Sequence, residues 1–266
     1  MKEDTYEDDS LVQKPGMLEV SHVSFGYPGR EKIYEDFNLS AFPGQIIGVT
    51  GAVACGKSTL GKTFLCEYPY EGRIRFHGKE LSEMTKAERT GMIGYLGHDP
   101  ELFNDSVRNN ILMGDDDDPE KYLKAVCFDG EVAEMEEGMD TIVGNGGVRL
   151  SGGQAQRLAL ARTLCHKRPV LILDDPFSAL DRKTEEEVFA NLRKFTADSI
   201  VILLSHRLYL FPEMDQVLWM EAGKVTAGTH EQILEKFPEY ARLYEAQADG
   251  ADAHNTQEGG PDHAEK

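Results

Sequence analysis

The sequence has no long apolar run and is short of basic residues. No apolar stretch in its 266 residues approaches the ~18 residues that span a bilayer, so we expect no transmembrane helix in it. Lys and Arg number 28 against 47 Asp and Glu, which gives a formal net charge of −19. Proteins that bind DNA or RNA non-specifically need basic surface to neutralise phosphates. The charge therefore argues against a nucleic-acid partner, and equally against adhesion to anionic lipid.

Cysteine is scarce, and no targeting segment is evident. The four cysteines show no metal-ligand spacing; they are Cys55, Cys66, Cys127 and Cys165. They indicate free thiols in a reducing cytosol rather than a disulfide framework. The first ten residues, MKEDTYEDDS, are acidic, unlike a signal peptide or an Arg-rich transit peptide. These features predict a cytoplasmic protein.

Two polar segments flank a region with the patterns of a folded domain. Residues 1–16 are acidic, and residues 247–266 are rich in Gly, Asp and His without an apolar period. We expect both segments to be disordered. Apolar residues make up 40% of the chain, and residues 17–246 are numerous enough to bury a sizeable core.

Strand and helix patterns alternate along residues 17–246. Strands are predicted at 17–25, 45–51, 73–76, 92–96, 169–175, 199–205 and 216–229, the last with a turn at Ala222-Gly223. Helices are predicted at 57–66, 151–167, 231–237 and 239–247. Residues 104–147 are acidic, helix-like and poor in strand signals, and we interpret them as part of an inserted helical subdomain. Strands that alternate with helices favour an α/β fold with a mainly parallel sheet.

The segment GAVACGKST, residues 51–59, matches the phosphate-loop motif G-x-x-x-x-G-K-[ST] between a predicted strand and a predicted helix. Gly51 and Gly56 permit backbone angles that direct successive N–H groups inward, at the start of a helix. Lys57 supplies a positive charge for the β- and γ-phosphates, and the Ser58 hydroxyl can coordinate Mg²⁺. A glycine-rich turn could match the motif by chance. The predicted strand before it and the predicted helix after it favour a phosphate loop instead. The predicted nucleotide contacts are Gly51, Ala52, Val53, Ala54, Cys55, Gly56, Lys57, Ser58 and Thr59.

The segment LILDDPFSALD, residues 171–181, ends a buried strand in two adjacent acids. The acid that holds Mg²⁺ together with Ser58 should lie at the end of a second buried strand, and Asp174 fills that position. Asp174 could instead cap a turn before Pro176. The phosphate loop in the same chain favours the metal role.

The segment LSGGQAQR, residues 150–157, predicts a second anion site, since Ser151 opens a helix and two glycines leave backbone N–H groups open. Most phosphate-loop enzymes have only one such site. With this segment, the phosphate loop and the Asp174 strand in that order, residues 17–246 resemble the nucleotide-binding domain of ABC transporters. The resemblance implies a RecA-like P-loop NTPase core with a mainly parallel sheet, an N-terminal antiparallel β subdomain and an α-helical subdomain within about residues 99–160.

The resemblance also implies roles for further residues. Tyr27 in SFGYPG lies where this family stacks an aromatic ring on adenine, and SALD (178–181) resembles the D-loop at the dimer seam. His206 in LLSHRL resembles the switch histidine that contacts the γ-phosphate. Asp175, His206 and Lys57 would form the catalytic set. The signature residues would act on the ATP of a partner; they are Ser151, Gly152, Gly153 and Gln154.

The family's mechanism requires two partners. Two nucleotide-binding domains pair head to tail and trap two ATP molecules, each between the phosphate loop of one domain and the signature of the other. Closure moves a transmembrane domain or subunit, and hydrolysis resets it. The segments DTIVGNGGVRLSGGQ and GTHEQIL resemble the exporter branch in particular. The resemblance therefore implies ATP and Mg²⁺ as cofactors and a location on the cytoplasmic face of a membrane.

Three residues of the predicted site depart from the family pattern. Ala54 replaces a glycine, which would cost of order 1 kcal/mol if its φ is positive. His98 stands where the Q-loop has glutamine, and an imidazole nitrogen suits Mg²⁺ less than an amide oxygen does. Asp175 stands where hydrolytic members have glutamate and is shorter by roughly 1.5 Å. Because a misplacement near 1 Å can cost about a hundredfold in rate, these departures predict the catalytically weak half of a heterodimer. Ile142, where exporters often have an acid, leaves the docking partner open.

Two other functions stay open at this stage. One is a soluble ABC ATPase that acts on ribosomes or DNA, which usually has two cassettes, coiled coils or basic surfaces. The other is a regulatory nucleotide-binding module with little hydrolysis, which the three departures favour. Whether the chain is a subunit or a domain is also open, although the initial Met and the polar ends favour a subunit. The transported substrate is not encoded in this segment.

Overall fold

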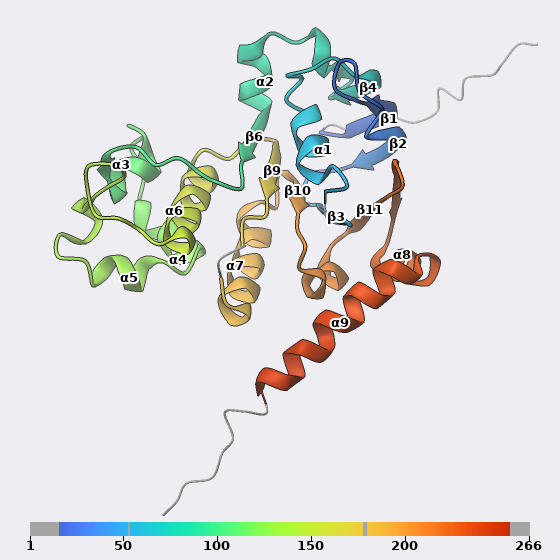
Figure 1. Ribbon diagram of the computed structural model, residues 1–266. Coiled ribbons are helices and arrows are strands. Elements are labelled where there is room, and N and C mark those ends of the chain that lie inside the picture. Colours follow the sequence, from blue (N-terminus) through green and yellow to red (C-terminus); the bar gives the residue numbers. More distant parts are fainter. Residues whose placement is uncertain (1–15, 53, 178–179, 256–266) are drawn as a thin grey trace, which may run out of the picture.

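The computed structural model describes residues 16–52, 54–177 and 180–255 (Figure 1). No helix in these ranges combines the length and the apolar character needed to cross a bilayer. The segment 1–15, which we expected to be disordered, lies outside the described residues, as do Val53, Ser178, Ala179 and residues 256–266.

The centre of the molecule is a parallel sheet. Within the described ranges its strands lie in the order β11 (Gln216–Glu221), β3 (Ile46–Gly51), β10 (Ile200–Leu204), β9 (Val170–Asp174) and β6 (Ile93–Leu96). All four neighbouring pairs are parallel. Every residue of β3, β9 and β10 is buried, as expected of strands that are covered on both faces. The predicted α/β class with a mainly parallel core is confirmed.

Antiparallel strands extend this sheet on one side. They are β1 (Leu18–Phe25), β2 (Tyr34–Ala41), β4 (Glu71–Phe76), β5 (Lys79–Glu80) and β12 (Lys224–Gly228). Strand β1 pairs antiparallel with both β2 and β4. Strand β12 forms a hairpin with β11, and the turn lies at Ala222 and Gly223, which both have positive φ. The predicted turn is therefore correct, and the antiparallel part of the fold prediction is confirmed.

Side chains of the central strands contribute to two apolar cores. One core joins Leu171 and Leu203 to Phe189 of helix α7 (Arg182–Phe195). The other joins Ile172 and Ile202 of the same strands to helix α1 (Lys57–Thr63) and to the antiparallel strands. Since successive strand residues point to opposite faces, α1 and α7 cover opposite faces of the sheet. Because α1 follows β3 directly in the chain, the start of α1 lies near the carboxyl end of β3.

The helical part lies to one side of the sheet (Figure 1). It contains α3 (Val107–Leu112), α4 (Pro119–Ala125), α5 (Asp129–Ala133) and α6 (Gly152–Cys165), with the short strands β7 (Asp105–Ser106) and β8 (Ile142–Val143). Helix α6 packs against α3 and α4, and side chains such as Val107, Phe128 and Leu158 are fully buried between them. Short 3₁₀-helices occur at Leu81–Glu83, Gly138–Asp140 and Leu208–Glu213.

Several elements differ from the sequence expectation. Strand β2, helix α7 and helix α2 (Lys86–Met92) were not predicted. Helix α8 (His230–Lys236) agrees, but helix α9 runs over Pro238–Asn255. The interpretation of residues 247–266 as disordered is therefore wrong for 247–255. Pro238 suits the first position of a helix, and the Ala, Glu and Gln residues that follow favour its continuation.

Candidate nucleotide-binding site

The phosphate loop connects β3 to α1, as predicted. Gly56 has φ 101° and precedes the helix, and among the described residues no side chain caps the first N–H groups of α1. A Cβ on Gly51 would lie 2.4 Å from the carbonyl oxygen of Met220, so only glycine fits there without a shift of backbone. Ala54 has a positive φ of 62°. This is the condition under which we expected its Cβ to strain the loop. The prediction for Val53 falls outside the described residues.

Lys57 is buried at the start of α1. Its ammonium donates to the carbonyl oxygens of Gly51 and Ala52, both at 3.4 Å. Burial lowers the pKa of Lys57, and Cys55 and the carboxylates of Asp175 and Asp174 oppose this change. The ammonium of Lys57 thus lies against the backbone of the phosphate loop, and the charges of both aspartates act on it.

Asp174 ends β9 and is buried, with 7% of its surface exposed. The hydroxyl of Tyr95, on the neighbouring strand β6, donates a hydrogen bond of 3.1 Å to its Oδ2. Sequence reasoning missed Tyr95, because no motif marks it and the two residues are 79 positions apart. The Tyr95 hydroxyl therefore engages one of the two carboxylate oxygens of Asp174.

The oxygen donors of Ser58 and Asp174 suit Mg²⁺ that is bound together with a nucleotide. In the described part of the chain, no group of three or more His, Cys, Asp and Glu side chains could hold a metal ion. Mg²⁺ is usually held by one or two carboxylates together with substrate phosphates and water, rather than by a protein cage. A hydroxyl from Ser58 and a carboxylate from Asp174 are hard oxygen donors of that kind.

Asp175 and His98 face each other across the carboxyl ends of β9 and β6. His98 Nδ1 lies 4.0 Å from Asp175 Oδ2, and the side chains are 56% and 20% exposed. Asp175 has φ 50°, and its N–H donates to Leu204 of β10 at 2.8 Å. Burial raises the pKa of Asp175, while His206, His98 and Arg207 act in the opposite direction. The structure therefore brings together two residues that the sequence treated as separate departures.

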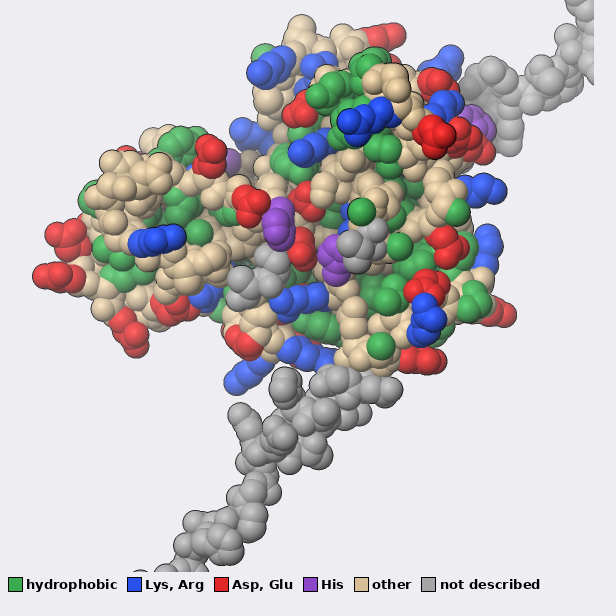
Figure 2. All heavy atoms as spheres, in the orientation of Figure 1, with side chains coloured by type: hydrophobic (Ala, Val, Ile, Leu, Met, Phe, Trp, Pro, Cys, Tyr) green, Lys and Arg blue, Asp and Glu red, His purple; other side chains and the backbone are tan. Residues whose placement is uncertain are grey.

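His206 follows β10 and has an exposed side chain. Partial desolvation by the surrounding residues lowers the pKa of His206, and the positive charge of Lys57 lowers it further, whereas Asp175 and Asp174 raise it. The neutral imidazole is therefore the main form at neutral pH. Lys57, Asp174 and Asp175 therefore lie close enough to the imidazole of His206 for their charges to act on it. In Figure 2, histidine, acidic and basic side chains meet where the helical part adjoins the sheet.

Tyr27 lies between β1 and β2 and reaches the phosphate-loop helix. Its hydroxyl is 3.5 Å from Thr59 Oγ1. The rings of Phe25 and Tyr68 contact the Tyr27 ring edge to face, each with a centroid distance of 5.3 Å. Tyr68 is 45% exposed. No sequence motif indicated that it would lie at this site. Aromatic side chains therefore gather beside the phosphate loop, where a base could stack.

The signature residues form a capping box at the start of α6. The Ser151 hydroxyl accepts a hydrogen bond from the Gln154 N–H, and Gln154 Oε1 accepts one from the Ser151 N–H. Gln154 also donates to Glu131 at 2.7 Å. A Cβ on Gly152 would meet nothing within 4 Å, so this end of the helix is open. Figure 1 shows α6 in the helical part and α1 beside the antiparallel strands, so the signature and the phosphate loop lie in different parts of the chain.

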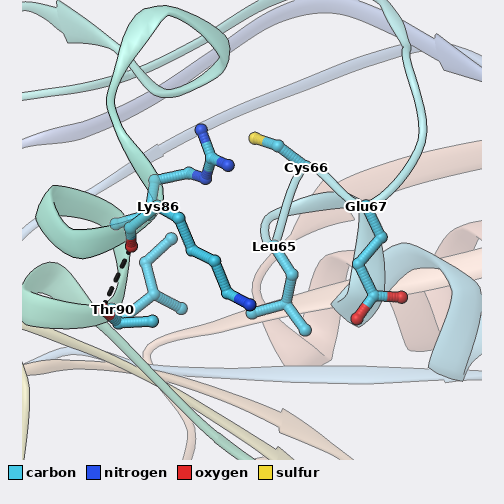
Figure 3. Close-up of a pocket in the computed structure, with 7 residues that line it drawn as sticks. Leu65, Cys66, Glu67, Lys86 and Thr90 are labelled. Atoms are coloured by element: carbon cyan, nitrogen blue, oxygen red, sulfur yellow. Dashed lines mark hydrogen bonds between the residues drawn. The ribbon is translucent and has the colours of Figure 1, made fainter.

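A cavity of about 360 Å³ lies elsewhere, between α2 and the residues that follow α1 (Figure 3). It is lined by Leu65, Cys66, Glu67, Lys86, Arg89, Thr90 and Ile93. The Thr90 hydroxyl donates to the Lys86 carbonyl oxygen at 3.0 Å beside it. No residue of the predicted site lines this cavity, so it is separate from the nucleotide site.

Comparison with known proteins identifies the family. The profile of the ABC transporter family matches residues 34–178, which is more than half of the chain. The chain belongs to the ABC transporter family. ATP-binding domains of ABC transporters are ATPases.

Individual ABC transporters extend the match over most of the chain. The chain is 35% identical over 243 residues to a probable multidrug resistance ABC transporter ATP-binding/permease protein of Bacillus subtilis, covering 89% of the chain and 42% of that protein. It is 38% identical over 242 residues to an ATP-dependent lipid A-core flippase of Pseudomonas syringae, covering 88% and 40%. A solved bacterial Atm1-family ABC exporter with ATP bound matches with a TM-score of 0.81 and 30% identity, over 90% of this chain and 43% of that one. The chain thus spans less than half the length of these relatives.

Proposed function

We propose that this chain is the ATP-hydrolysing part of an ABC exporter, in which head-to-tail pairing of two nucleotide-binding domains drives a transmembrane partner. The observation that carries the proposal is the separation of the two anion sites. The helix start at Ser151 and Gly152 lies in the helical part, whereas Lys57 lies at the start of α1, which packs on the sheet. A signature that lies apart from the phosphate loop of its own chain needs a second copy or a related chain to complete the site.

The transmembrane partner would dock on an apolar patch of the helical part. Phe103, Ile142 and Val148 are 53%, 43% and 52% exposed. Their segments are joined, because the Val148 N–H donates to the Ile142 carbonyl at 2.8 Å and Gly146 N–H donates to Asn104 Oδ1 at 3.1 Å. Exposed apolar side chains that cluster in this way mark interaction sites. Docking there would hold the chain on the cytoplasmic face of a membrane. At position 142, the apolar side chain of Ile142 would contact the partner in place of the acid that exporters often have.

Hydrolysis would use the groups at the carboxyl ends of β3, β9 and β10. Mg²⁺, held by Ser58, Asp174 and the nucleotide phosphates, would neutralise charge that develops on the transferred phosphoryl group. Lys57 would bind the β- and γ-phosphates, and neutral His206 would contact the γ-phosphate. Asp175 would orient the attacking water.

The shortened carboxylate favours a weak site. Asp175 lacks one methylene of the usual glutamate, and its neighbour His98 is an imidazole in place of an amide. We propose that this chain is the catalytically weak half of a heterodimer, whose intact signature serves the better site of its partner. The same departures support the alternative of a regulatory module that closes on ATP with little hydrolysis.

Kinetics with purified protein test the proposal. We expect the chain alone to bind ATP in the presence of Mg²⁺, to turn it over slowly, and to gain turnover when its membrane partner and second nucleotide-binding domain are added. Single-turnover measurements with and without that partner separate the transporter from the regulatory module, which would show no gain. An ordinary steady rate from the chain alone, abolished by Asp175→Ala, would show that the weak-half assignment is wrong.

A further inference from the structure

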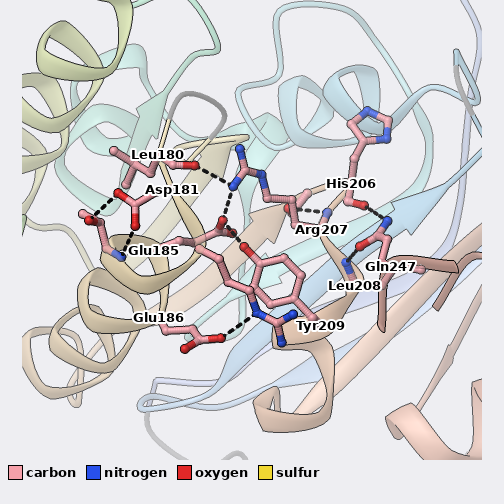
Figure 4. A network of polar contacts seen from close by, with 12 residues as sticks. Leu180, Asp181, Glu185, Glu186, His206, Arg207, Leu208, Tyr209 and Gln247 are labelled. Atoms are coloured by element: carbon pink, nitrogen blue, oxygen red, sulfur yellow. Dashed lines mark hydrogen bonds and ion pairs between the residues drawn. The ribbon is translucent and has the colours of Figure 1, made fainter. Parts of the chain in front are cut away.

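The backbone on both sides of Arg207 is held by one side chain from the C-terminal helix. Gln247, on α9, donates from Nε2 to the His206 carbonyl oxygen at 2.8 Å. Its Oε1 accepts a hydrogen bond of 2.7 Å from the Leu208 N–H. Figure 4 shows this amide beside residues 206–208. The two bonds satisfy backbone groups that follow the end of β10.

The opposite side of the same segment is held by α7 and by residue 180. Arg207 Nη1 donates to the Leu180 carbonyl oxygen at 2.9 Å and forms an ion pair with Glu185. The Glu185 side chain is fully buried and also accepts a hydrogen bond from the Tyr209 hydroxyl. Residues 206–209 therefore lie between α9 on one side and α7 on the other (Figure 4).

The imidazole of His206 depends on this backbone for its position. Among the described residues, no side chain forms a hydrogen bond with the ring, and the ring is exposed. Its place is set by the φ and ψ angles of residue 206 and by its own rotamer. Since a misplacement near 1 Å can cost about a hundredfold in rate, the hydrogen bonds that fix this backbone control where the ring meets a phosphate.

We propose that Gln247 is a positioning residue for His206, so that helix α9 acts as a structural part of the ATP site. This inference rests on the proposed contact of His206 with the γ-phosphate. It goes beyond that contact by assigning a role to a residue outside all the sequence motifs. Loss of the Gln247 amide leaves the site residues intact but frees the backbone that carries His206.

Hydrogen exchange of the Leu208 amide tests the structural step without nucleotide. We expect Gln247→Leu, which keeps an apolar side chain at this position but removes both polar groups, to increase exchange of this amide at least tenfold. Glu245→Leu, at an exposed position of the same helix, should leave it unchanged. Gln247→Glu keeps the acceptor for Leu208 but loses the donor to His206, so it should retain most of the protection at Leu208. Equal exchange in Gln247→Leu and Glu245→Leu would overturn the inference.

Calorimetric titration with ATP and with ADP, both with Mg²⁺, tests the functional step. We expect both Gln247 variants to lose preference for ATP over ADP by at least fivefold, while their affinity for ADP stays within twofold of the wild type. A residue with a purely structural role would lower both affinities together, and that result would overturn the inference. If wild-type protein showed no ATP hydrolysis even with its partner, the proposed function would fail, but the exchange at Leu208 would still decide the role of Gln247.

Discussion

His98 Nδ1 lies 4.0 Å from Asp175 Oδ2, so two residues that both depart from the family pattern face each other. The distance exceeds that of a hydrogen bond and leaves the carboxylate free to orient a water molecule. Both residues follow the carboxyl ends of neighbouring parallel strands, β6 and β9. A change at one position should therefore alter the effect of a change at the other.

Lengthening the carboxylate should increase hydrolysis. We expect Asp175→Glu to raise steady-state ATP turnover at least tenfold, because the added methylene recovers roughly 1.5 Å of reach toward the attacking water. A coupled assay for released phosphate measures the rate, and Asp116→Glu, at an exposed position, is the matched control.

The double variant Asp175→Glu/His98→Gln tests whether the two positions are coupled. Restoring both family residues should raise turnover by more than the product of the two single effects, since the imidazole faces the longer carboxylate. Unchanged turnover in both Asp175→Glu and the double variant would contradict the assignment of Asp175 as the residue that limits the rate.

The phosphate loop should become more stable when Ala54 is replaced by glycine. Ala54 has φ 62°, where a Cβ costs roughly 1–2 kcal/mol, while glycine costs about 0.5–1 kcal/mol in chain entropy. We expect Ala54→Gly to raise the free energy of unfolding by about 0.5–1 kcal/mol, as measured by urea denaturation without nucleotide. Ala87→Gly, the same substitution in helix α2, should lower it by about 1 kcal/mol. A loss of stability in both variants would show that Ala54 is not strained.

The sequence alone predicted the parallel core and the phosphate-binding motifs, because both depend on local patterns. The runs VLILD and IVILL became the buried strands β9 and β10, and the phosphate loop lies between β3 and α1. Helix α7 carried a usable signal that was missed, since Asp181 caps it and Val188, Phe189 and Leu192 share its buried face. Strand β2, YEDFNLSA, mixes charged and apolar residues, so its pattern is weak.

Contacts around the site could not be predicted in the same way. Tyr95 and Asp174 are 79 residues apart, and Gln247 and His206 are 41 apart. Hydrogen bonds between such residues depend on strand order and helix packing, which no single segment specifies. The pairing of His98 with Asp175 is of the same kind, because β6 and β9 become neighbours only in the assembled sheet.

Removal of the Tyr95 hydroxyl should weaken metal binding. The hydroxyl donates to Asp174 Oδ2 at 3.1 Å, and partners that orient ligating carboxylates typically contribute 10–100-fold to metal affinity or activity. We expect Tyr95→Phe to lower the affinity for Mn²⁺, used in place of Mg²⁺, about tenfold in the presence of a non-hydrolysable ATP analogue. Electron paramagnetic resonance of free Mn²⁺ measures this directly. Tyr70→Phe, which removes a hydroxyl bonded to Glu80 instead, is the control, and equal Mn²⁺ affinity in both variants would contradict the prediction.

His230 gives the folded protein a dependence on pH that is separate from the ATP site. It begins α8, is 6% exposed, and its Nδ1 lies 2.7 Å from the Tyr240 hydroxyl of α9. Burial lowers the pKa of His230, with Glu231 acting in the opposite direction. The unfolded chain, with an ordinary histidine pKa near 6.5, therefore binds a proton more readily than the folded chain does.

The consequence for stability follows from proton linkage. The contribution of neutral His230 is fully present above about pH 6.5 and is lost as the pH falls from there toward the lowered pKa of the folded state. We expect urea denaturation to show a larger loss of unfolding free energy between pH 7.5 and 5.5, both chosen as roughly one unit on either side of that value, in the wild type than in His230→Asn. If His230→Asn lost as much stability over this interval as the wild type, the buried imidazole would not be the group that titrates.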